Sequence, residues 1–390
     1  MSDPGATAAP AAERCHNCDR EVPPGHFCAV CGSRLDRPER EGVLRRGHFA
    51  AHPNERVFAL WLVSALLPHL PHRRQSTFRL ALALAVALLA LFGLLGLNAP
   101  TVAFAAASVP CLYFLYLWEV EVYEDRPLVV GGMLLVGGVV LGVLWAHFTG
   151  SLTTSSVALQ RLVTGPQAST VLEFGVAQPV VQQAVMLLPA LATLVVFRRR
   201  FTEALDGFTF GAAGALGFTL GATVIDLLPV FQAGQLSIVD PLVNMVQVVL
   251  RGFLVPVINA STTGLIGATI WLLRGRRRDD VGHPVTALPA AAGIALVAQI
   301  LVPLVGTLTA LVWIQALVAV LVTLVLIVTV RSALHHLLLA EAAEVREAGP
   351  PFTCPHCRHL VPRLAFCPNC GVAVRATSKR GEGRAARGVR

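Results

Sequence analysis

The stretch FGVAQPVVQQAVMLLPALATLVVFRRRFTEALDGFTFGAAGALGFTLGATV, residues 174–224, decides the class of this protein. It holds two apolar runs, each about as long as the 20 residues that a helix needs to cross a bilayer. Three arginines, residues 198–200, separate the two runs. Because arginine is enriched in cytoplasmic loops, this stretch predicts two membrane-crossing helices joined on the cytoplasmic side.

Apolar runs of similar length continue in both directions along the chain. Together they predict eight spans, at residues 77–97, 99–118, 128–148, 171–197, 207–231, 242–273, 286–303 and 307–330. The chain is 55% hydrophobic and 14% charged, whereas a soluble domain averages about 25% charged residues. This composition excludes a soluble enzyme and indicates an all-α polytopic membrane protein. The last two spans are separated only by residues 304–306, with Pro303 and Gly306 at this tight connection, and could instead form one hairpin that does not fully cross.

The basic residues are distributed unevenly between the predicted loops. Those on one side are Arg73, Arg74, Arg79, Arg126, Arg198, Arg199, Arg200, Arg274, Arg276, Arg277, Arg278 and Arg331. The loops predicted on the other side hold one arginine, Arg161. By the positive-inside rule, we expect an integral protein of the plasma (inner) membrane with both termini cytoplasmic.

Both ends of the chain carry the same cysteine pattern. Residues 15–32 read CHNCDREVPPGHFCAVCG and residues 354–371 read CPHCRHLVPRLAFCPNCG, each with two Cys-x-x-Cys pairs. Four thiolates at such spacing form the closed tetrahedral site of structural zinc, which has no open position for catalysis. Disulfides are disfavoured because cytoplasmic thiols stay reduced. We therefore predict two structural Zn²⁺ ions per chain, held by Cys15, Cys18, Cys28 and Cys31 and by Cys354, Cys357, Cys367 and Cys370.

Each module looks like a short zinc ribbon, and its other residues match as well. Gly32 and Gly371 directly follow the last cysteine and suit a turn that needs a positive φ. Phe27 and Phe366 are expected to supply the small core of their own ribbon, while the metal supplies most of the folding free energy. Because both ribbons are predicted on the cytoplasmic face, they could pair within one chain or between chains.

These features divide the chain into segments. They are a disordered start at 1–13, the first ribbon at 14–35, a linker at 36–76 with a short interfacial helix, a transmembrane domain at 77–331, a juxtamembrane helix at 332–349, the second ribbon at 352–374 and a basic disordered tail at 375–390. The tail could contact anionic lipid headgroups.

The polar residues of the middle spans carry a family resemblance. Residues 174–224 are followed by VLRGFLVPVINASTTGLIGATI at 249–270 and AAGIALVAQILVP at 291–303, and preceded by YLWEVEVYEDRP at 116–127. This succession resembles the PrsW-type intramembrane metalloproteases, relatives of the CAAX-prenyl-protease-like membrane enzymes. The resemblance covers roughly residues 110–305. It implies a helical membrane enzyme that binds a metal and activates water.

The resemblance also implies a ligand set: a Glu-Glu pair on one helix, a Glu on the next, and His residues on later helices. In this chain these fall on Gln182 and Gln183, near Ala222, on Asn259 and near Val297. Amides cannot take up a proton at neutral pH and are poor zinc ligands beside carboxylate or imidazole. We therefore expect a degenerate relative, a pseudoprotease in which Gln182, Gln183 and Asn259 form a neutral polar knot or serve only as interhelical glue.

Ionisable residues elsewhere in the spans offer another possible site. We expect Arg251 to pair with Asp226, because a buried charge is costly without a partner. An active protease with a displaced site would have to draw its ligands from His147, Glu173, Asp226 and Asp240.

Three functions remain open from the sequence. The first is a non-catalytic membrane scaffold whose cytoplasmic zinc ribbons bind a protein partner; few basic residues lie on the ribbons, which favours protein over nucleic acid. The second is an active intramembrane metalloprotease with a displaced site. The third is a transporter or channel, for which internal repeats of the spans would be expected.

Overall fold

A computed structural model describes residues 12–16, 19–30, 32–36, 77–120, 128–153, 167–197, 201, 204–232, 245–275, 287–309, 311–343, 349–354 and 357–372. The chain divides into two compact units. One unit comprises Met1–Pro71, Val120–Glu124 and Leu334–Arg390 and contains both cysteine modules; the other comprises His72–Glu119 and Asp125–Ala333. The interfacial helix predicted at 57–67 and the tail at 375–390 lie outside the described residues.

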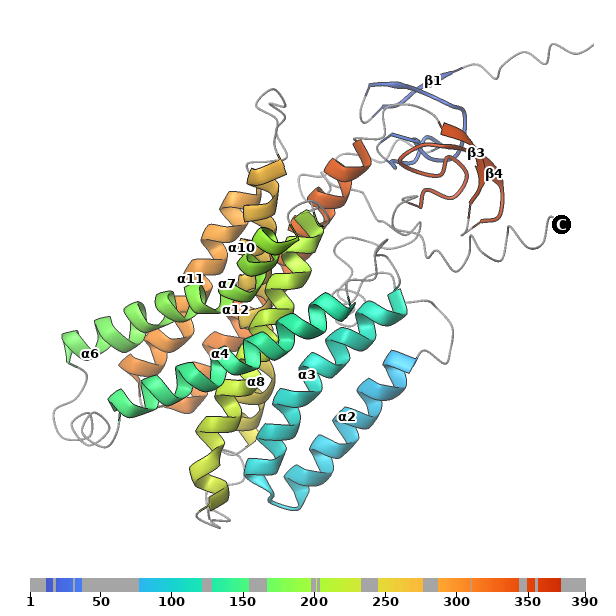
Figure 1. Ribbon diagram of the computed structural model, residues 1–390. Helices are drawn as coiled ribbons and strands as arrows, with labels where there is room; N and C mark the ends of the chain where they lie inside the picture. The colour runs from blue at the N-terminus through green and yellow to red at the C-terminus, as the bar shows by residue number, and fades with distance from the viewer. Residues whose placement is uncertain are drawn as a thin grey trace, which may run out of the picture. The chain divides into compact units, whose positions relative to one another are not determined.

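The regular elements described in the second unit are all helices (Figure 1). Its helices are α2 (Thr77–Leu94), α3 (Asn98–Val120), α4 (Leu128–Thr153), α6 (Ala168–Leu172), the π-helical turn η2 (Glu173–Ala177), α7 (Gln178–Val196), α8 (Ala204–Gln232), the π-helical segment η3 (Val248–Leu254), α10 (Val255–Gly275), α11 (Ala287–Leu308) and α12 (Val312–Ala343). Two of these helices, α3 and α12, run on into residues of the other unit.

Seven helices in the described part of the chain are long and apolar enough to cross a membrane, and α2 adds a shorter apolar helix over Thr77–Gly93. The predicted class, an all-α polytopic membrane protein with about eight spans, is therefore confirmed. α11 and α12 are separate helices with apolar stretches of 20 and 23 residues, so each is long enough to cross. α12 continues through Ala343, which means that the helix expected at 332–349 begins as its extension.

The helices α2 and α3 form an antiparallel hairpin at one edge of the helical unit (Figure 1). At one end of the hairpin the rings of Phe78 and Tyr116 lie 6.1 Å apart, and at the other end those of Phe92 and Phe104 lie 5.6 Å apart. Both pairs meet edge to face, the arrangement that aromatic quadrupoles favour. These contacts fix the register of the hairpin.

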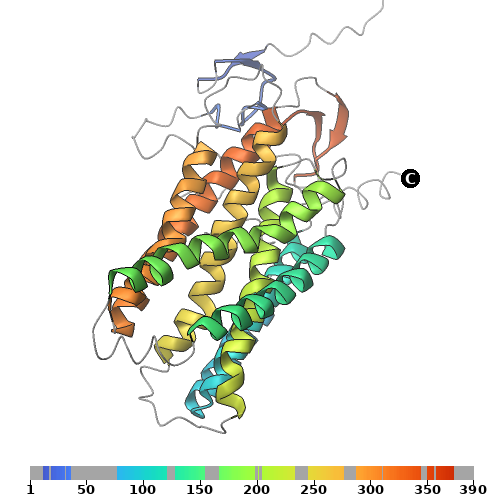
Figure 2. The ribbon, with the colours of Figure 1, turned by 60° about the vertical axis from the view of Figure 1, so that its left-hand side comes forward.

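The centre of the unit is α8, which packs against α4 and α10 (Figure 2). Glycines bring the backbones of α4 and α8 into contact: a Cβ at Gly142 would lie 2.0 Å from the carbonyl oxygen of Phe218. In the other direction, a Cβ at Gly217 would lie 2.0 Å from the carbonyl oxygen of Leu135, and Gly138 meets α8 as closely. Small residues at such spacing let membrane helices approach closely. Their association is then stabilised by van der Waals packing, because the hydrophobic effect does not act between helices in lipid.

The opposite side of α8 meets α10 in the same manner. Gly207 and Gly267 face one another, and a Cβ on either would lie within 2.6 Å of the other's carbonyl oxygen. Beside them, the indole N–H of Trp271 donates to the Phe201 carbonyl at 3.3 Å. The ring of Phe210 lies between those of Phe201 and Trp271. Thus α8 is held at backbone distance from a neighbour on each of two sides.

The first unit contains two small hairpins with the same backbone plan. β1 (Glu13–Arg14) pairs with β2 (Glu21–Val22), and β3 (Gly349–Thr353) pairs with β4 (Leu360–Arg363), both antiparallel. Gly32 and Gly371 both have φ of 72°, which confirms that this position needs the left-handed conformation. Such matching conformations show that the repeated sequence produces a repeated fold.

We predict that the α4–α8 contact tolerates no side chain at Gly142. In Gly142→Val the new side chain must displace the α8 backbone at Phe218, so the helical unit should lose about 1–3 kcal/mol of stability. Gly137→Val is the matched control, because nothing lies within 4 Å of a Cβ at Gly137. Thermal unfolding of the detergent-solubilised protein should show a lower midpoint for Gly142→Val alone; equal midpoints for the two variants would contradict the close contact.

Candidate functional site

Six uncharged polar side chains meet inside the helical unit, and we call them the amide cluster. They are Gln183 on α7, Thr219 on α8, Asn259, Thr262 and Thr263 on α10, and Gln299 on α11. Each is between 0% and 4% exposed. Each also lies near the middle of its apolar span, so the cluster belongs to the membrane interior, where buried polar groups must find partners within the protein.

One half of the cluster joins α7 to α10. The side-chain amide of Gln183 donates to the Thr263 hydroxyl at 2.9 Å. The Thr262 hydroxyl lies 3.2 Å from the side-chain oxygens of both Gln183 and Gln299 and 2.9 Å from the Ile258 carbonyl. Since one hydroxyl carries one hydrogen, Thr262 can satisfy any of these acceptors in turn.

The other half extends to α11 and α8. Gln299 donates from its amide nitrogen to the Asn259 side-chain oxygen at 3.1 Å, and Asn259 donates to the Thr219 hydroxyl at 2.9 Å. Thr219 in turn donates to the Ala215 carbonyl at 2.8 Å. The amide cluster therefore ties four helices together through a continuous chain of contacts at hydrogen-bond distance, in which the side-chain oxygens of Gln183 and Gln299 share the single hydroxyl hydrogen of Thr262.

A π-helical segment precedes each of the two central amides. η2 lies before Gln183 and η3 before Asn259, and a proline follows each segment within two residues, Pro179 and Pro256. Proline has no N–H to offer the carbonyl four residues earlier, so the regular helix cannot continue through it unchanged. The wider turn rotates the residues that follow, and such segments are frequent at functional sites.

The structure brings together only some of the residues that the family pattern had indicated. Gln183 and Asn259 belong to the amide cluster, whereas Gln182 is half-buried and makes no hydrogen bond to another described residue. Ala222 lies one turn beyond Thr219, which takes the expected place on α8. Val297 is 64% exposed; the residue that faces the cluster from α11 is Gln299.

Sequence reasoning therefore missed Gln299 and the three threonines. A signal was present for three of them: Gln299 is the one polar side chain in the run IALVAQILVP, and Thr262 and Thr263 form the TT of STTG. A polar residue alone in an apolar span is expensive unless it faces a partner, so Gln299 could have been assigned to the interior.

The charged residues of the spans form no comparable site. Arg251 and Asp226 are near enough for the guanidinium to attract the carboxylate, but they do not reach the 4.0 Å of a direct ion pair. The displaced-site candidates His147 and Glu173 are exposed, and with Asp226 they assemble into no metal-binding group among the described residues. Asp240 lies outside the described residues.

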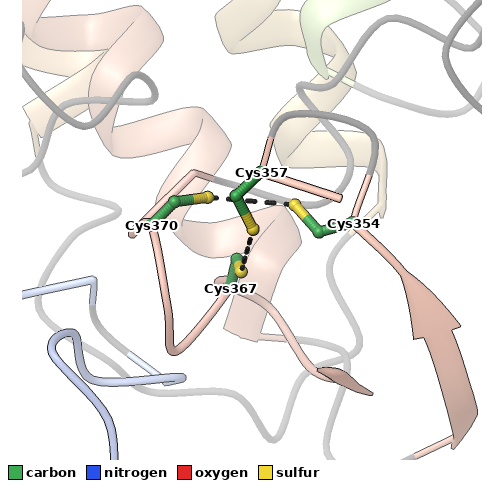
Figure 3. Close-up of side chains that lie close together, drawn as sticks. All are labelled: Cys354, Cys357, Cys367 and Cys370. Carbon is green, nitrogen blue, oxygen red and sulfur yellow. Dashed lines mark hydrogen bonds between the residues drawn. The ribbon is translucent and has the colours of Figure 1, made fainter. Parts of the chain in front are cut away.

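The four cysteines of the C-terminal ribbon converge on one point (Figure 3). Their sulfur atoms all lie within 4.8 Å of one another, with Cys354 and Cys370 at 3.8 Å and Cys357 and Cys367 at 3.8 Å. Four sulfurs placed 2.3 Å from a tetrahedral Zn²⁺ would be about 3.8 Å apart. The tetrad could therefore hold a metal ion of this size.

The backbone of each Cys-x-x-Cys turn explains this convergence. The N–H groups of Arg358 and Gly371 donate to the carbonyls of Cys354 and Cys367, both at 2.8 Å. Each bond closes a tight turn that points its sulfurs inward. The N-terminal ribbon has the same bonds, from Asp19 to Cys15 at 2.9 Å and from Gly32 to Cys28 at 2.8 Å. Cys15 and Cys28 are buried, while Cys18 and Cys31 lie outside the described residues.

Crowding of the thiols changes their acidity. A hydrogen bond with Cys354 raises the pKa of Cys367 to about 11, and burial adds to the shift. The pKa of Cys370 is raised as well, first by its hydrogen bond with Cys354 and then by that with Cys367. These two thiols thus hold their protons at neutral pH, and a metal ion must displace them in order to bind.

A family model of the PrsW family intramembrane metalloproteases matches residues 128–341, which is more than half of the 390-residue chain. The chain belongs to the PrsW family. The match begins at α4 and runs into the last turns of α12, so it includes every helix of the amide cluster and excludes α2, α3 and both ribbons. No curated protein matches the chain significantly, and no solved structure does.

Family membership raises the question of a metal inside the membrane unit. The amide cluster of this PrsW protein offers only amides and hydroxyls, all of them already bonded to one another. Within the described ranges, the one group of three or more His, Cys, Asp or Glu side chains close enough to hold a metal is the C-terminal cysteine tetrad. The residues present in the cluster do not fit a catalytic metal.

We predict that Asn259 is the most costly residue of the amide cluster to replace. Asn259→Leu leaves the Gln299 amide and the Thr219 hydroxyl without their shared partner, which should destabilise the helical unit by about 1–3 kcal/mol. Gln182→Leu is the control, since Gln182 has no such partner. Thermal unfolding in detergent should separate the two variants; a Gln182→Leu effect as large as that of Asn259→Leu would contradict this bonding scheme.

We also predict that metal affinity at the C-terminal tetrad falls as the pH is lowered. Because the metal displaces protons from Cys367 and Cys370, the affinity should drop about tenfold per pH unit for each proton released. Competition with a chelator between pH 8 and pH 6 measures this slope in the native protein, with alkylation of Cys354, Cys357, Cys367 and Cys370 reporting loss of the metal from the tetrad. An affinity independent of pH would mean that the thiols are already ionised before the metal arrives.

Proposed function

We propose that this PrsW family member is a non-catalytic membrane protein, a pseudoprotease. In place of the family's catalytic centre it has a hydrogen-bonded contact that holds helices together. The observation that supports it is the hydrogen bonding of the amide cluster. A neutral amide cannot act as a general base, and without a metal or a base water is too weakly acidic to be a nucleophile at neutral pH. Gln183, Asn259 and Gln299 instead use their polar atoms to hold α7, α8, α10 and α11 together.

The cysteine modules carry the binding function in this proposal. Each would hold one structural zinc ion, with both termini on the cytoplasmic face of the plasma membrane. The ribbons would dock a protein rather than a nucleic acid, because they carry few basic side chains and three of those in the N-terminal ribbon already have a partner. Arg14 pairs with Asp19 at 3.0 Å, His26 pairs with Asp36 at 2.6 Å, and Arg34 lies 5.5 Å from the ring centre of Phe27.

An active intramembrane protease is the second candidate, and the family match itself favours it. Such an enzyme would need a metal bound by the membrane unit in addition to the ribbons. The number of metal ions per chain therefore separates the two functions without knowledge of a substrate.

Metal analysis of the purified protein in detergent provides the test. We expect two zinc ions per chain in the native protein and none once all eight ribbon cysteines are replaced by serine. A metal ion that stays with the eight-serine variant would overturn the non-catalytic proposal and support the protease.

A positive control shows whether a membrane site would be detected. In Gln183→Glu, Asn259→His and Gln299→His combined, the three amides that now bond to one another through Asn259 and Thr262 become three metal ligands in one place. On the eight-serine background, this variant should gain one metal ion. The elution volume in size-exclusion chromatography confirms that it remains folded before its metal is counted.

A further inference from the structure

The two ribbons contact each other through reciprocal backbone hydrogen bonds. The N–H of Phe27 donates to the carbonyl of Pro368 at 3.0 Å, and the N–H of Phe366 donates to the carbonyl of Ala29 at 3.0 Å. In the repeated motif Phe27 corresponds to Phe366, and Ala29 corresponds to Pro368. The contact is therefore the same in both directions, as in a twofold-symmetric interface between identical subunits.

The residues that make this contact flank a metal ligand in each ribbon. Cys28 lies between Phe27 and Ala29, and Cys367 lies between Phe366 and Pro368. Both cysteines are fully buried, as are Ala29 and Phe366. The turn that holds the metal in one ribbon is thus also the edge on which the other ribbon docks.

Side chains reinforce the contact at two glycines. The ring of Phe27 lies against Gly371, where a Cβ would come within 2.5 Å of it. Phe27 was expected to fill the core of its own ribbon; its ring instead packs against the other one. At Gly25 a Cβ would lie 2.6 Å from the Pro368 carbonyl oxygen, so the absence of a side chain there lets the two chain segments meet.

We propose that the two ribbons form a single metal-dependent clasp, in which the metal held by each ribbon stabilises the docking edge that the other requires. This inference rests on metal binding by both ribbons, as proposed above. Modules of about twenty residues depend on their metal for folding, so loss of either metal disorders its turn and removes both hydrogen bonds. Coupling of this kind acts equally in the two directions, and the two metals are therefore released together.

The variant Gly25→Ala tests the clasp in the full-length protein. Its methyl group would collide with Pro368 of the other ribbon, whereas Gly25 has no positive φ that an alanine would strain. Pro24→Ala, at an exposed neighbouring position, is the control. We expect zinc release to a chromogenic chelator to be about tenfold faster in Gly25→Ala than in the control and the native protein.

Alkylation of the cysteines, read by mass spectrometry, shows which ribbon opens. The clasp predicts that in Gly25→Ala the cysteines of both ribbons become reactive at similarly increased rates. Faster labelling confined to Cys15, Cys18, Cys28 and Cys31 would overturn the clasp, because it would mean that the substitution only damages its own ribbon. Unchanged release and labelling would overturn it equally.

A second variant approaches the clasp from the other end. Cys354→Ser with Cys357→Ser removes the C-terminal metal without touching the N-terminal ribbon, and it should raise labelling of Cys15 and Cys28 about tenfold. Labelling at the native rate would overturn the coupling. If the native chain holds two zinc ions but releases them independently, the clasp is disproved. The metal sites of the proposed function would still be supported by such a result.

Discussion

The close approach of α8 to α4 and α10 is the contact on which the helical unit depends. Hydrocarbon gives helices no hydrophobic reason to associate, so their packing energy comes from surface contact and interhelical hydrogen bonds. Glycine at the crossing points lets backbone touch backbone on both sides of α8. This distance also brings Thr219 within reach of Asn259. With α8 displaced outward by the width of one side chain, the amide cluster would lose its connection to that helix.

In the pseudoprotease that we propose, the amide cluster takes the place of the family's reaction centre and carries no charge. Four helices still direct polar groups to a shared point near mid-span, and π-helical segments still precede two of them. A set of carboxylates and imidazoles at this point would need a cation or protons to offset the cost of charge in hydrocarbon. Amides and hydroxyls carry donors and acceptors together, so they satisfy one another with no ion present. The result is an interior that is polar yet neutral.

Hydropathy was enough to predict the helices of this protein, because membrane spans must be long, apolar and internally bonded. The positive φ of Gly32 and Gly371 could also be predicted, since it follows from local turn geometry. The exact members of the amide cluster could not. On α11 the family pattern pointed to Val297, whereas the polarity of Gln299 favours the interior; for Thr219 on α8 no such signal exists, and only the orientation of the helix decides that it faces the cluster.

That the ribbons could pair was expected from the sequence, but the atoms that make their contact could not be predicted. Its hydrogen bonds use main-chain groups, so they leave no mark in the sequence. The side-chain pattern around Phe27 is equally compatible with burial inside its own ribbon and with burial against the other ribbon. Only the repeat itself carried a hint, because two copies of one surface can be complementary to each other when the contact is reciprocal.

The ribbons can pair only after the chain between them has been synthesised. During synthesis the N-terminal ribbon leaves the ribosome while more than 300 residues, including every membrane span, are still to be made. At roughly 5 to 20 residues per second, its docking edge waits on the order of 15 to 60 seconds for the C-terminal ribbon. Until then Phe27 and Gly25 lack the contacts that Gly371 and Pro368 of the C-terminal ribbon provide. A chain that stops early keeps them bare, so the joined ribbons distinguish a finished membrane protein from an unfinished one.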